Sequence, residues 1–501
     1  MTLLFRNVQL LGAAQKYEGP IDVFVSGDKI SAIGNFPAKP ADTVIDGQGA
    51  YLAPGFIDVN TDSDHYLTLF DDPAQGDFLR QGVTTIIGGN CGASLAPLLY
   101  GGLESIQKWT DTSRFNVGWH TVAEFLAHFD KHPLGVNFGT LVGHSTIRRA
   151  LIGEVLRDLT KNELTVFVEI LRRAMAEGAF GLSTGLAYVH SRQTPYAEIK
   201  LLVEVVAQEK GVYTTHLRKT EKGVADAVDE TLRLSHETGV STIISHFLAI
   251  RGNEEEYRAS LEKINGLPES ATFHFDIYPF ETTVLPLYTF LPVWVQNGGV
   301  EVMRANITDK WMQQRIVKDL PKIEPLRLKV AAAPGNDILR GKTLGDLMDM
   351  FSLRDPAVAL MKLMTTTMLK ASVFYKNVNN ASSREAMKSS RSLIASNAAS
   401  MGTERKMERI DRGTETFPQF LSLVQNENLI SLDDAIRKIT IIPGQLFNIK
   451  KRGEIREGNF ADLTLFRGKE ILYTVVNGVI AFQNGALTGA CSGMPLKHYG
   501  V

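Results

Sequence analysis

The hydrophobic residues of this chain follow two different spacings along its length. Near the N-terminus, apolar and polar residues alternate over residues 3–10, 20–25 and 29–34, with Gly, Asp and Pro between these runs. Near the C-terminus, residues 458–466 and 473–482 show the same alternation. An alternation with period two predicts short strands that bury one face. We therefore expect a small β-domain that is built from both ends of the chain.

The middle of the chain alternates short apolar runs with stretches in which apolar residues recur every three or four positions. Stretches of the second kind, such as residues 161–177 and 196–210, predict amphipathic helices. Strands and helices in alternation predict an α/β fold, a (β/α)8 TIM-like barrel, in which functional residues lie where the strands end. The eight strands are expected within residues 53–62 and at residues 83–87, 139–143, 179–183, 212–216, 242–246, 272–276 and 393–397.

This pattern also predicts the domain organisation. Residues 1–54 and 447–501 would form the two parts of the small β-domain and a tail, and residues 55–446 would form the barrel. An insertion at about 297–390 separates the seventh strand from the eighth and mixes helical runs with basic segments. Its sequence is compatible with a cover over the barrel mouth and equally with helices packed on the side of the barrel.

Composition and charge exclude several classes of protein. The chain has 501 residues, of which 44% are hydrophobic and 22% charged, as is ordinary for a globular protein. A formal net charge of −2 gives no electrostatic reason to expect nucleic acid or an anionic membrane as a partner. The two cysteines lie far apart, no apolar run reaches about 18 residues, and the start lacks a signal peptide pattern. We expect a cytoplasmic protein, and the sequence leaves its oligomeric state open.

Three of the expected strand ends carry residue types that bind metals. Cys91 follows the second strand, and His216 and His246 close the fifth and the sixth. A thiolate and two imidazoles suit zinc, and three protein ligands leave a coordination position for water or substrate. Taken singly, a buried cysteine is also a small apolar residue, and a histidine at a strand end also forms ordinary hydrogen bonds. Their joint placement predicts one zinc ion.

Several motifs resemble the amidohydrolase superfamily and, within it, the branch of the N-acyl-D-amino-acid deacylases (D-aminoacylases). Pro54-Gly-Phe-Ile-Asp58 resembles the first barrel strand of the superfamily, and Gly88-Gly-Asn-Cys-Gly92 resembles the second strand end of this branch. Thr215-His-Leu-Arg218 and Ser245-His246 resemble its two single-histidine ligand motifs. The resemblance covers nearly the whole chain and is weakest in the insertion. It implies a metal-dependent deacylase that hydrolyses a non-peptide C–N amide bond of a small substrate.

The same resemblance exposes departures at the site. The branch carries His-x-His on the first strand, where this chain has Asn60 and Asp62, and its general-base aspartate after the eighth strand is Asn397. An amide accepts no proton at neutral pH and is a poor metal ligand. We therefore expect that a second metal position at these three residues is lost, with Asp62 the first candidate for proton transfer. Asp64 and His65 would reach a metal only if the loop took a different path.

Substrate-binding residues follow from the resemblance as well. Tyr188 ends a stretch that resembles one lining the site, Tyr278 matches a tyrosine that holds the substrate, and Ser245 precedes a ligand histidine. Packing inside the barrel is the alternative for both tyrosines. The lysine that binds the substrate carboxylate in the branch is Leu248 in this chain, and the next cation along the sequence is Arg251.

Two functions remain open at this stage. The retained cysteine and histidines favour a deacylase that acts on a small amide, with activity impaired by the altered residues. The changes at positions 60, 248 and 397 favour a catalytically inactive homologue that binds a ligand or a partner protein through the same barrel mouth.

Overall fold

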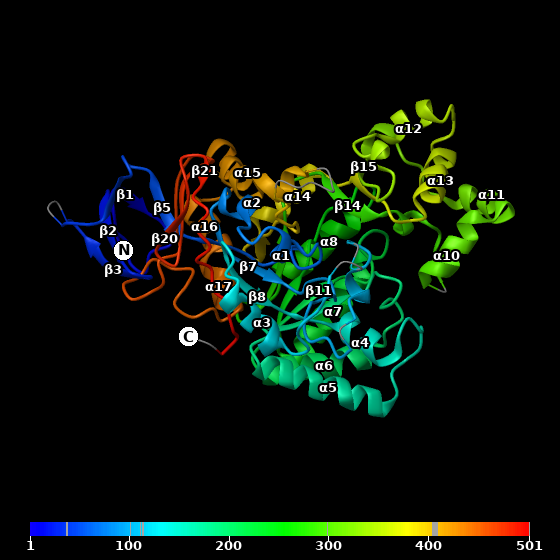
Figure 1. The fold of residues 1–501 in the computed structure, drawn as a ribbon, viewed down its shortest axis with the longest axis horizontal. Coiled ribbons are helices and arrows are strands. Elements are labelled where there is room, and N and C mark those ends of the chain that lie inside the picture. Colours follow the sequence, from blue (N-terminus) through cyan, green and yellow to red (C-terminus); the bar gives the residue numbers. More distant parts are fainter. Residues whose placement is uncertain are drawn as a thin grey trace.

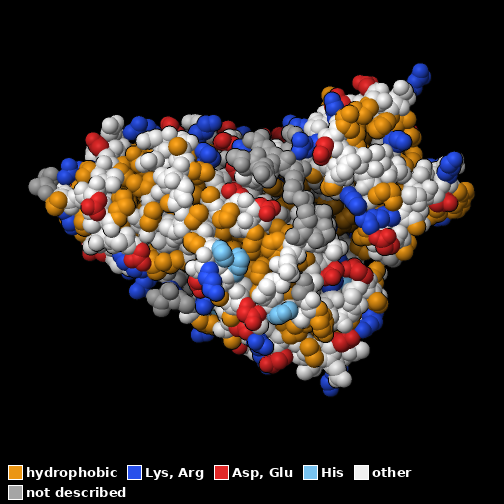
Figure 2. All heavy atoms as spheres, in the orientation of Figure 1, with side chains coloured by type: hydrophobic (Ala, Val, Ile, Leu, Met, Phe, Trp, Pro, Cys, Tyr) orange, Lys and Arg blue, Asp and Glu red, His pale blue; other side chains and the backbone are white. Residues whose placement is uncertain are grey.

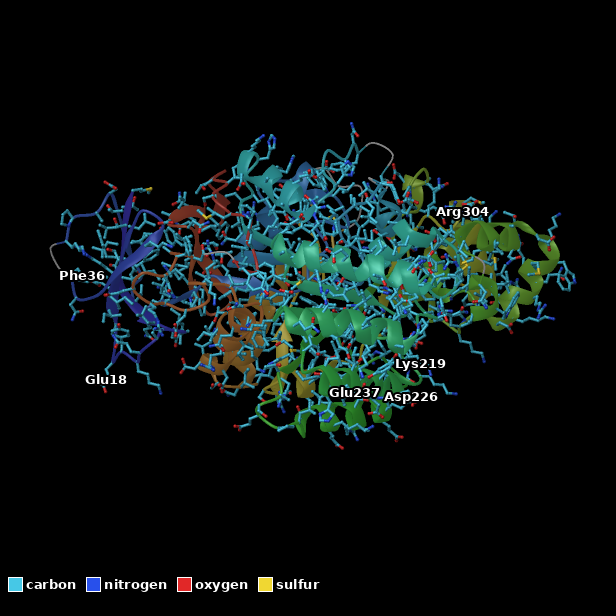
Figure 3. All side chains as sticks on the ribbon, turned by 90° about the horizontal axis from the view of Figure 1, so that it is seen from below. Glu18, Phe36, Lys219, Asp226, Glu237 and Arg304 are labelled. Carbon is cyan, nitrogen blue, oxygen red and sulfur yellow. The ribbon has the colours of Figure 1, made fainter. Side chains whose placement is uncertain are left out.

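The structure is a computed structural model that describes residues 1–36, 39–100, 102–110, 112, 115–297, 299–402 and 409–499. Figure 1 shows a β-domain of blue and red strands at one end of the molecule, a barrel in the centre and a yellow-green helical lobe at the other end. In the space-filling view of Figure 2, the helical lobe stands away from the rest of the molecule. Figure 3 places Phe36 on the β-domain and Arg304 on the helical lobe, at opposite ends of the long axis.

The β-domain is one nine-stranded sheet to which both ends of the chain contribute, as the alternating pattern predicts. The order along the sheet is β21-β20-β19-β18-β5-β1-β2-β3, and β4 pairs with β1. The two halves join where β18 runs antiparallel to β5, with Leu463 opposite Pro54. Its strands are β1 (Thr2–Leu10), β2 (Ile21–Ser26), β3 (Lys29–Gly34), β4 (Thr43–Asp46), β5 (Tyr51–Pro54), β18 (Leu463–Arg467), β19 (Glu470–Val476), β20 (Val479–Gln483) and β21 (Ala486–Leu487).

The centre of the molecule is a parallel barrel of eight strand positions. Two segments separated only by Leu141 share the third position. The first and last strands meet through backbone hydrogen bonds, from Asn397 N to Asn60 O and from Asp62 N to Ala398 O, each 2.9 Å long, so the (β/α)8 barrel is closed. In barrel order the strands are β6 (Phe56–Asp58), β7 (Val83–Gly88), β8 (Asn137–Thr140) with β9 (Val142–Gly143), β10 (Gly181–Gly185), β11 (Val212–His216), β12 (Ser241–Ile244), β13 (Phe273–Ile277) and β17 (Ser392–Ile394).

Amphipathic helices cover the barrel strands. In α5, Thr160 and Glu163 form a capping box at the start, and Phe167, Leu171 and Met175 turn one apolar stripe inward. The larger helices around the barrel are α3 (Val122–Lys131), α4 (His144–Ile152), α5 (Lys161–Ala176), α6 (Tyr196–Gln208), α7 (Val224–Thr238), α8 (Glu254–Asn265), α14 (Asn380–Lys388), α15 (Asp411–Glu427), α16 (Leu432–Ile439) and α17 (Ile441–Leu446). Shorter pieces are α1 (Thr68–Asp71), α2 (Gly76–Leu79) and the 3-10 turn η1 (Glu104–Ile106).

The excursion between β13 and β17 has a small sheet and a hydrophobic core of its own. The sheet is antiparallel in the order β14-β16-β15, and because β14 belongs to it, the excursion includes residues before 297. The sequence pattern shows none of these three strands. The elements are β14 (Thr282–Pro286), η2 (Leu287–Phe290), α9 (Val293–Gln296), α10 (Gly299–Thr308), α11 (Lys310–Asp319), η3 (Pro325–Arg327), β15 (Leu328–Ala332), η4 (Asp337–Leu339), α12 (Leu344–Met350), α13 (Pro356–Thr367) and β16 (Ser372–Lys376).

Two consequences follow for the site. A cavity of about 1540 Å³ lies at the carboxyl ends of the barrel strands, and both barrel loops and the excursion line it. Tyr288 and Gln296 of the excursion face the same cavity as Cys91 and His216 of the barrel. Part of the excursion thus lines the cavity at the barrel mouth, while its helical lobe stands away from the barrel. Among the described helices, none has the length and apolar character that crossing a membrane requires.

Candidate functional site

Closure of the barrel brings the first and eighth strand ends together around one buried carboxylate. Asp58, the last residue of β6, accepts hydrogen bonds from the backbone N–H groups of Asn60 (3.2 Å) and Ser396 (3.1 Å). The burial of Asp58 raises the pKa of its carboxyl to about 7. These hydrogen bonds fix the paths of the two backbone segments that place Asp62 and Asn397 at the cavity.

The structure brings Cys91, His216 and His246 together. Their ligand atoms all lie within 4.8 Å of one another. The Sγ of Cys91 lies 3.4 Å from Nε2 of His246, and the two imidazole rings have centroids 4.5 Å apart. Nδ1 of His216 is buried and has no hydrogen-bond partner among the described residues. One thiol and two imidazoles at this spacing, with an orphaned ring nitrogen, fit a zinc ion.

The backbone holds two of these residues in an unusual conformation. Cys91 has φ 52° and His246 has φ 37°, in the left-handed region that non-glycine residues rarely adopt. Such conformations cost on the order of 1–3 kcal/mol each and persist where the surroundings fix them. Close packing fixes Cys91, because a Cβ on Gly92 would lie 2.7 Å from Gly185 N, and one on Gly185 would lie 2.2 Å from Cys91 O. The glycine after Cys91 in the Gly-Asn-Cys-Gly motif is therefore a packing requirement.

Burial keeps all three side chains neutral. It lowers the pKa of His246 to about 4, lowers that of His216 well below the ordinary value, and raises that of the Cys91 thiol. Neutral imidazoles present their lone pairs to a cation at neutral pH. The thiol gives up its proton when it binds a metal, so metal binding releases a proton.

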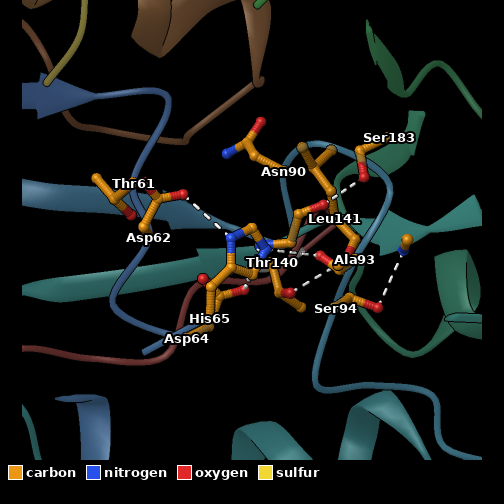
Figure 4. Close-up of polar contacts among 12 residues, drawn as sticks. Thr61, Asp62, Asp64, His65, Asn90, Ala93, Ser94, Thr140, Leu141 and Ser183 are labelled. Carbon is orange, nitrogen blue, oxygen red and sulfur yellow. Dashed lines mark hydrogen bonds and ion pairs between the residues drawn. The ribbon is translucent and has the colours of Figure 1, made fainter. Parts of the chain in front are cut away.

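Asp62 and His65 form a buried pair beside these three residues. Nδ1 of His65 lies 3.0 Å from Oδ1 of Asp62, and Nε2 lies 3.0 Å from the carbonyl oxygen of Ala93, as Figure 4 shows. A carbonyl only accepts, so Nε2 carries a hydrogen, and an ionised Asp62 requires a second one on Nδ1. With Asp62 ionised, the pair is an imidazolium and a carboxylate. The His65 ring also stacks on Trp109, with centroids 4.2 Å apart.

The pKa values of the pair agree with this assignment. Burial by itself raises the pKa of Asp62, but the hydrogen bond and the charge of His65, followed by the charge of Arg412, lower it below the ordinary value. Burial by itself lowers the pKa of His65, but the charge of Asp64 and the hydrogen bond and charge of Asp62 raise it above the ordinary value. Both ring nitrogens of His65 have partners in the protein, so His65 is no metal ligand in this arrangement. Asp64 is also engaged, since it accepts the N–H of Gly89 at 2.6 Å.

Asn60 acts on the candidate metal site through Asp276. Its Nδ2 donates to Asp276 at 3.1 Å, and Oδ1 of Asp276 accepts the backbone N–H of His246 at 2.7 Å. Burial raises the pKa of Asp276 to about 7. The amide at position 60 thus orients the carboxylate that holds His246 in its left-handed conformation.

The predicted substrate-binding residues all line the cavity, and so does Asn397, whose φ is 45°. Tyr188 stands next to the candidate metal site, with its ring centroid 4.8 Å from that of His216. Oγ of Ser245 is buried and lacks a hydrogen-bond partner in the described ranges. Tyr278 accepts a hydrogen bond from Arg412. Leu248 contributes an apolar wall.

The structure adds residues that sequence reasoning missed. Arg412, in the first turn of α15, is buried, lines the cavity and donates from Nη1 to the Tyr278 hydroxyl at 3.0 Å. Lys108, in the loop after β7, also lines the cavity. Neither lies in a motif, so no signal in the sequence separates them from surface cations. Arg251, the nearest cation along the sequence, lines the cavity wall and pairs with Glu281 at 3.3 Å.

Comparison with known proteins agrees with the fold and the site. Residues 297–481 match the model of the Amidohydrolase family. D-aminoacylase of Alcaligenes xylosoxydans xylosoxydans is 28% identical over 493 residues, which cover 95% of this chain and 93% of that protein. N-acyl-D-aspartate deacylase of the same organism is 27% identical over 449 residues, which cover 89% of this chain and 81% of that protein.

Solved structures show the same architecture. A crystal structure of D-aminoacylase matches with a TM-score of 0.82 at 24% identity, covering 99% of both chains. N-acyl-D-glutamate deacylase from Bordetella bronchiseptica, complexed with zinc and a phosphonate inhibitor, matches with a TM-score of 0.80 at 23% identity, again over 99% of both chains. At these identities the structural likeness establishes the fold.

Over most of its length the chain is therefore similar to D-aminoacylase and a related deacylase, and residues 297–481 match the Amidohydrolase family.

The donor set yields the first prediction. We expect about one zinc ion per chain in protein purified without chelator, because three soft donors suit one ion and Asn60 and Asn397 are poor ligands. Cys91→Ala should lower the zinc content at least tenfold at a fixed low zinc concentration, and Cys491→Ala serves as the matched control. Elemental analysis of the three proteins measures this. Unchanged zinc in Cys91→Ala, or no zinc in the wild type, would contradict the assignment.

Proposed function

We propose that this chain is a metal-dependent amidohydrolase that cleaves the non-peptide C–N amide bond of a small N-acyl amino acid. The observation that carries the proposal is the joint placement, in one cavity, of the Cys91, His216 and His246 set and the Asp62 carboxylate. The relatives are named as deacylases of N-acyl-D-amino acids, which supports substrates of the D series. Zinc in the structure of N-acyl-D-glutamate deacylase from Bordetella bronchiseptica supports zinc as the metal.

Cys91, His216 and His246 would hold the ion. When bound, zinc supplies a Lewis acid that polarises the amide carbonyl and lowers the pKa of water. The chain's own residues must then position the substrate and move the protons. The neutral imidazoles and the fixed left-handed backbone of Cys91 and His246 arrange the ligands in advance, so little reorganisation remains when the metal binds.

Asp62 is the group suited to accept a proton. Its Oδ1 is engaged by His65, and its Oδ2 has no hydrogen-bond partner within the described part of the chain. The imidazolium of His65 holds the carboxylate ionised and oriented. Asp62 would take a proton from the attacking water through Oδ2 and pass it to the amide nitrogen. The hydroxyl adds to the carbonyl carbon, the C–N bond breaks, and the products are a carboxylic acid and an amine.

Substrate orientation falls to the residues around Arg412. This guanidinium is buried, and its Nε has no partner among the residues that the structure describes. The substrate carboxylate would bind Arg412, with the Tyr278 hydroxyl beside it. This arrangement replaces the cation that is absent at Leu248. Tyr188, next to His216, would contact the reacting amide.

The rival function is a catalytically inactive homologue that binds a ligand or a partner through the same mouth. Asn397 favours it, since an amide stands where the branch has its general base. The two functions differ in one measurable respect, because only the enzyme needs the Asp62 carboxylate.

Removing that carboxylate tests the enzyme directly. Asp62→Asn should lower kcat for N-acetyl-D-amino acids about 10²- to 10⁴-fold, the usual contribution of a positioned acid–base group, while zinc content stays at the wild-type level. Asp71→Asn changes a carboxylate on the outer cavity wall and is the matched control, with little expected effect. A wild type without turnover across N-acyl-D- and N-acyl-L-amino acids, or an active Asp62→Asn, would contradict the proposal.

The pH dependence tests the role of His65. A general base acts only when deprotonated, so activity is lost as the pH falls through the pKa of Asp62. His65 holds that pKa below the ordinary value, and His65→Asn removes the positive charge while keeping an N–H donor. The buried carboxyl then titrates at a higher pH, and the acid limb of kcat/KM should move to higher pH, with Asp71→Asn again as the control. An acid limb that stays in place in His65→Asn would show that Asp62 is not the base.

A further inference from the structure

The indole of Trp109 covers one face of the His65 ring. The two rings lie nearly parallel, with an interplanar angle of 13° and centroids 4.2 Å apart. Trp109 is half-buried and lines the cavity, whereas the side chain of the stacked His65 has no exposed surface. The indole is therefore a part of the cavity wall behind which the imidazole lies.

Contacts on two sides hold this indole in place. Trp109 follows η1, and its backbone N–H donates to the carbonyl oxygen of the fully buried Ile106 at 2.9 Å. Its ring meets that of Tyr188 edge to face, with centroids 6.0 Å apart at 83°, an arrangement that aromatic pairs prefer. Tyr188 in turn contacts His216. Trp109 is thus held both by its own loop and by the ring that adjoins the candidate metal site.

The same indole contacts two cations. Nζ of Lys108 lies 3.9 Å from its centroid, and the imidazolium of His65 is stacked on it. The face of an indole attracts cations, and this attraction grows where water is excluded. Burial by itself lowers the pKa of His65, so a charged ring at this position needs favourable contacts. The carboxylates of Asp62 and Asp64 supply one part of them, and the stack on Trp109 supplies another.

The hydrogen bonds of His65 depend on the orientation of its ring. Nδ1 lies 3.0 Å from Oδ1 of Asp62 and Nε2 lies 3.0 Å from the carbonyl oxygen of Ala93, as Figure 4 shows. Both N–H groups lie in the plane of the imidazole, so a rotation of the ring out of this plane breaks both bonds. A flat indole packed on one face prevents that rotation and keeps water from that face.

We propose that Trp109 is a positioning residue for the Asp62–His65 pair. Its indole holds the plane of the imidazole and keeps cavity water away, so that the hydrogen on Nδ1 stays on the carboxylate that handles the proton. Trp109 acts through His65 and has no role of its own at the reacting atoms. This inference rests on the proposed function, because that function gives the Asp62 carboxylate its task.

Proton NMR of the zinc-loaded protein tests the proposal without turnover. A hydrogen that an imidazolium donates to a carboxylate resonates far downfield of the amide hydrogens, and it is seen only while water is kept from the bond. The wild type should show this signal at neutral pH, and its absence from His65→Asn assigns it. Trp109→Leu should broaden or lose the signal through exchange with water, whereas Trp109→Phe keeps a flat aromatic face and should retain it.

The control is Trp311→Leu, which removes an exposed indole from α11 and should leave the signal as it is. A signal that stays equally sharp in Trp109→Leu overturns the proposal, and so does a wild type that lacks the signal.

Kinetics of the same variants measure what the positioning contributes. Trp109→Leu should lower kcat for N-acetyl-D-amino acids about twofold to thirtyfold, the range of a cation–π contact, with KM and zinc content little changed. His65 would then hold the pKa of Asp62 down less firmly, so the acid limb of kcat/KM should move to higher pH. Trp109→Phe should recover most of the wild-type kcat.

A double variant separates positioning from a merely structural role. In the His65→Asn background, Trp109→Leu should have little further effect on kcat, since the ring that Trp109 positions is gone. The variants leave in place the other titratable groups that act on the pair or lie against the indole, namely Asp64, Tyr66, Cys91, Lys108, His246 and Arg412.

The two experiments fail separately. An unchanged acid limb in a folded, zinc-loaded Trp109→Leu, or equal losses of kcat from Trp109→Leu with and without His65, overturns the positioning role. If the wild type turns over no substrate but the downfield signal is lost in Trp109→Leu alone of the Trp109 and Trp311 variants, the proposed reaction fails and the positioning of the pair by Trp109 stands.

Discussion

The site depends on the closure of the barrel between its first and last strands. Asp58 accepts hydrogen bonds from backbone N–H groups at both strand ends. Backbone hydrogen bonds between Asn60 and Asn397 and between Asp62 and Ala398 continue this junction of the two strands. These bonds join Asn60 to Asn397, which lie 337 positions apart in the sequence, so that both strand ends reach the same cavity. A charge at Asp58 is costly so deep in the protein, and burial therefore raises the pKa of its carboxyl to about 7.

This junction also explains how the chain accommodates two residues, Asn60 and Asp62, that differ from the D-aminoacylase pattern. Asn60 donates to Asp276 and so orients the carboxylate behind His246. Asp62 gains an imidazolium partner in His65, which holds it ionised in a buried position. Under the proposed function, these changes would remove a second metal position, leave Cys91, His216 and His246 as the three donors, and transfer proton handling to Asp62 on the first strand.

The sequence predicts the fold well because the barrel strands are short apolar runs and their ends carry chemically distinctive residues. Cys91, His216 and His246 are recognisable for that reason, although their binding of zinc stays a prediction. The predicted domain boundaries stay predictions as well. The strands of the excursion escape detection because Thr282–Pro286 shows neither a clean alternation nor a long apolar run. Arg412 and Lys108 escape because a lone cation in a loop or a first helical turn looks like a solvated surface residue. The role of His65 depends on a three-dimensional contact with Ala93 that no local spacing encodes.

The central claim is that one cysteine and two histidines hold a single zinc ion at this mouth. X-ray absorption at the zinc edge on the loaded protein tests it most directly. The account predicts one sulfur ligand at about 2.3 Å and two imidazole nitrogens at about 2.0–2.1 Å, with remaining ligands from oxygen. A zinc environment without sulfur, or one that keeps its sulfur in Cys91→Ala, would contradict it.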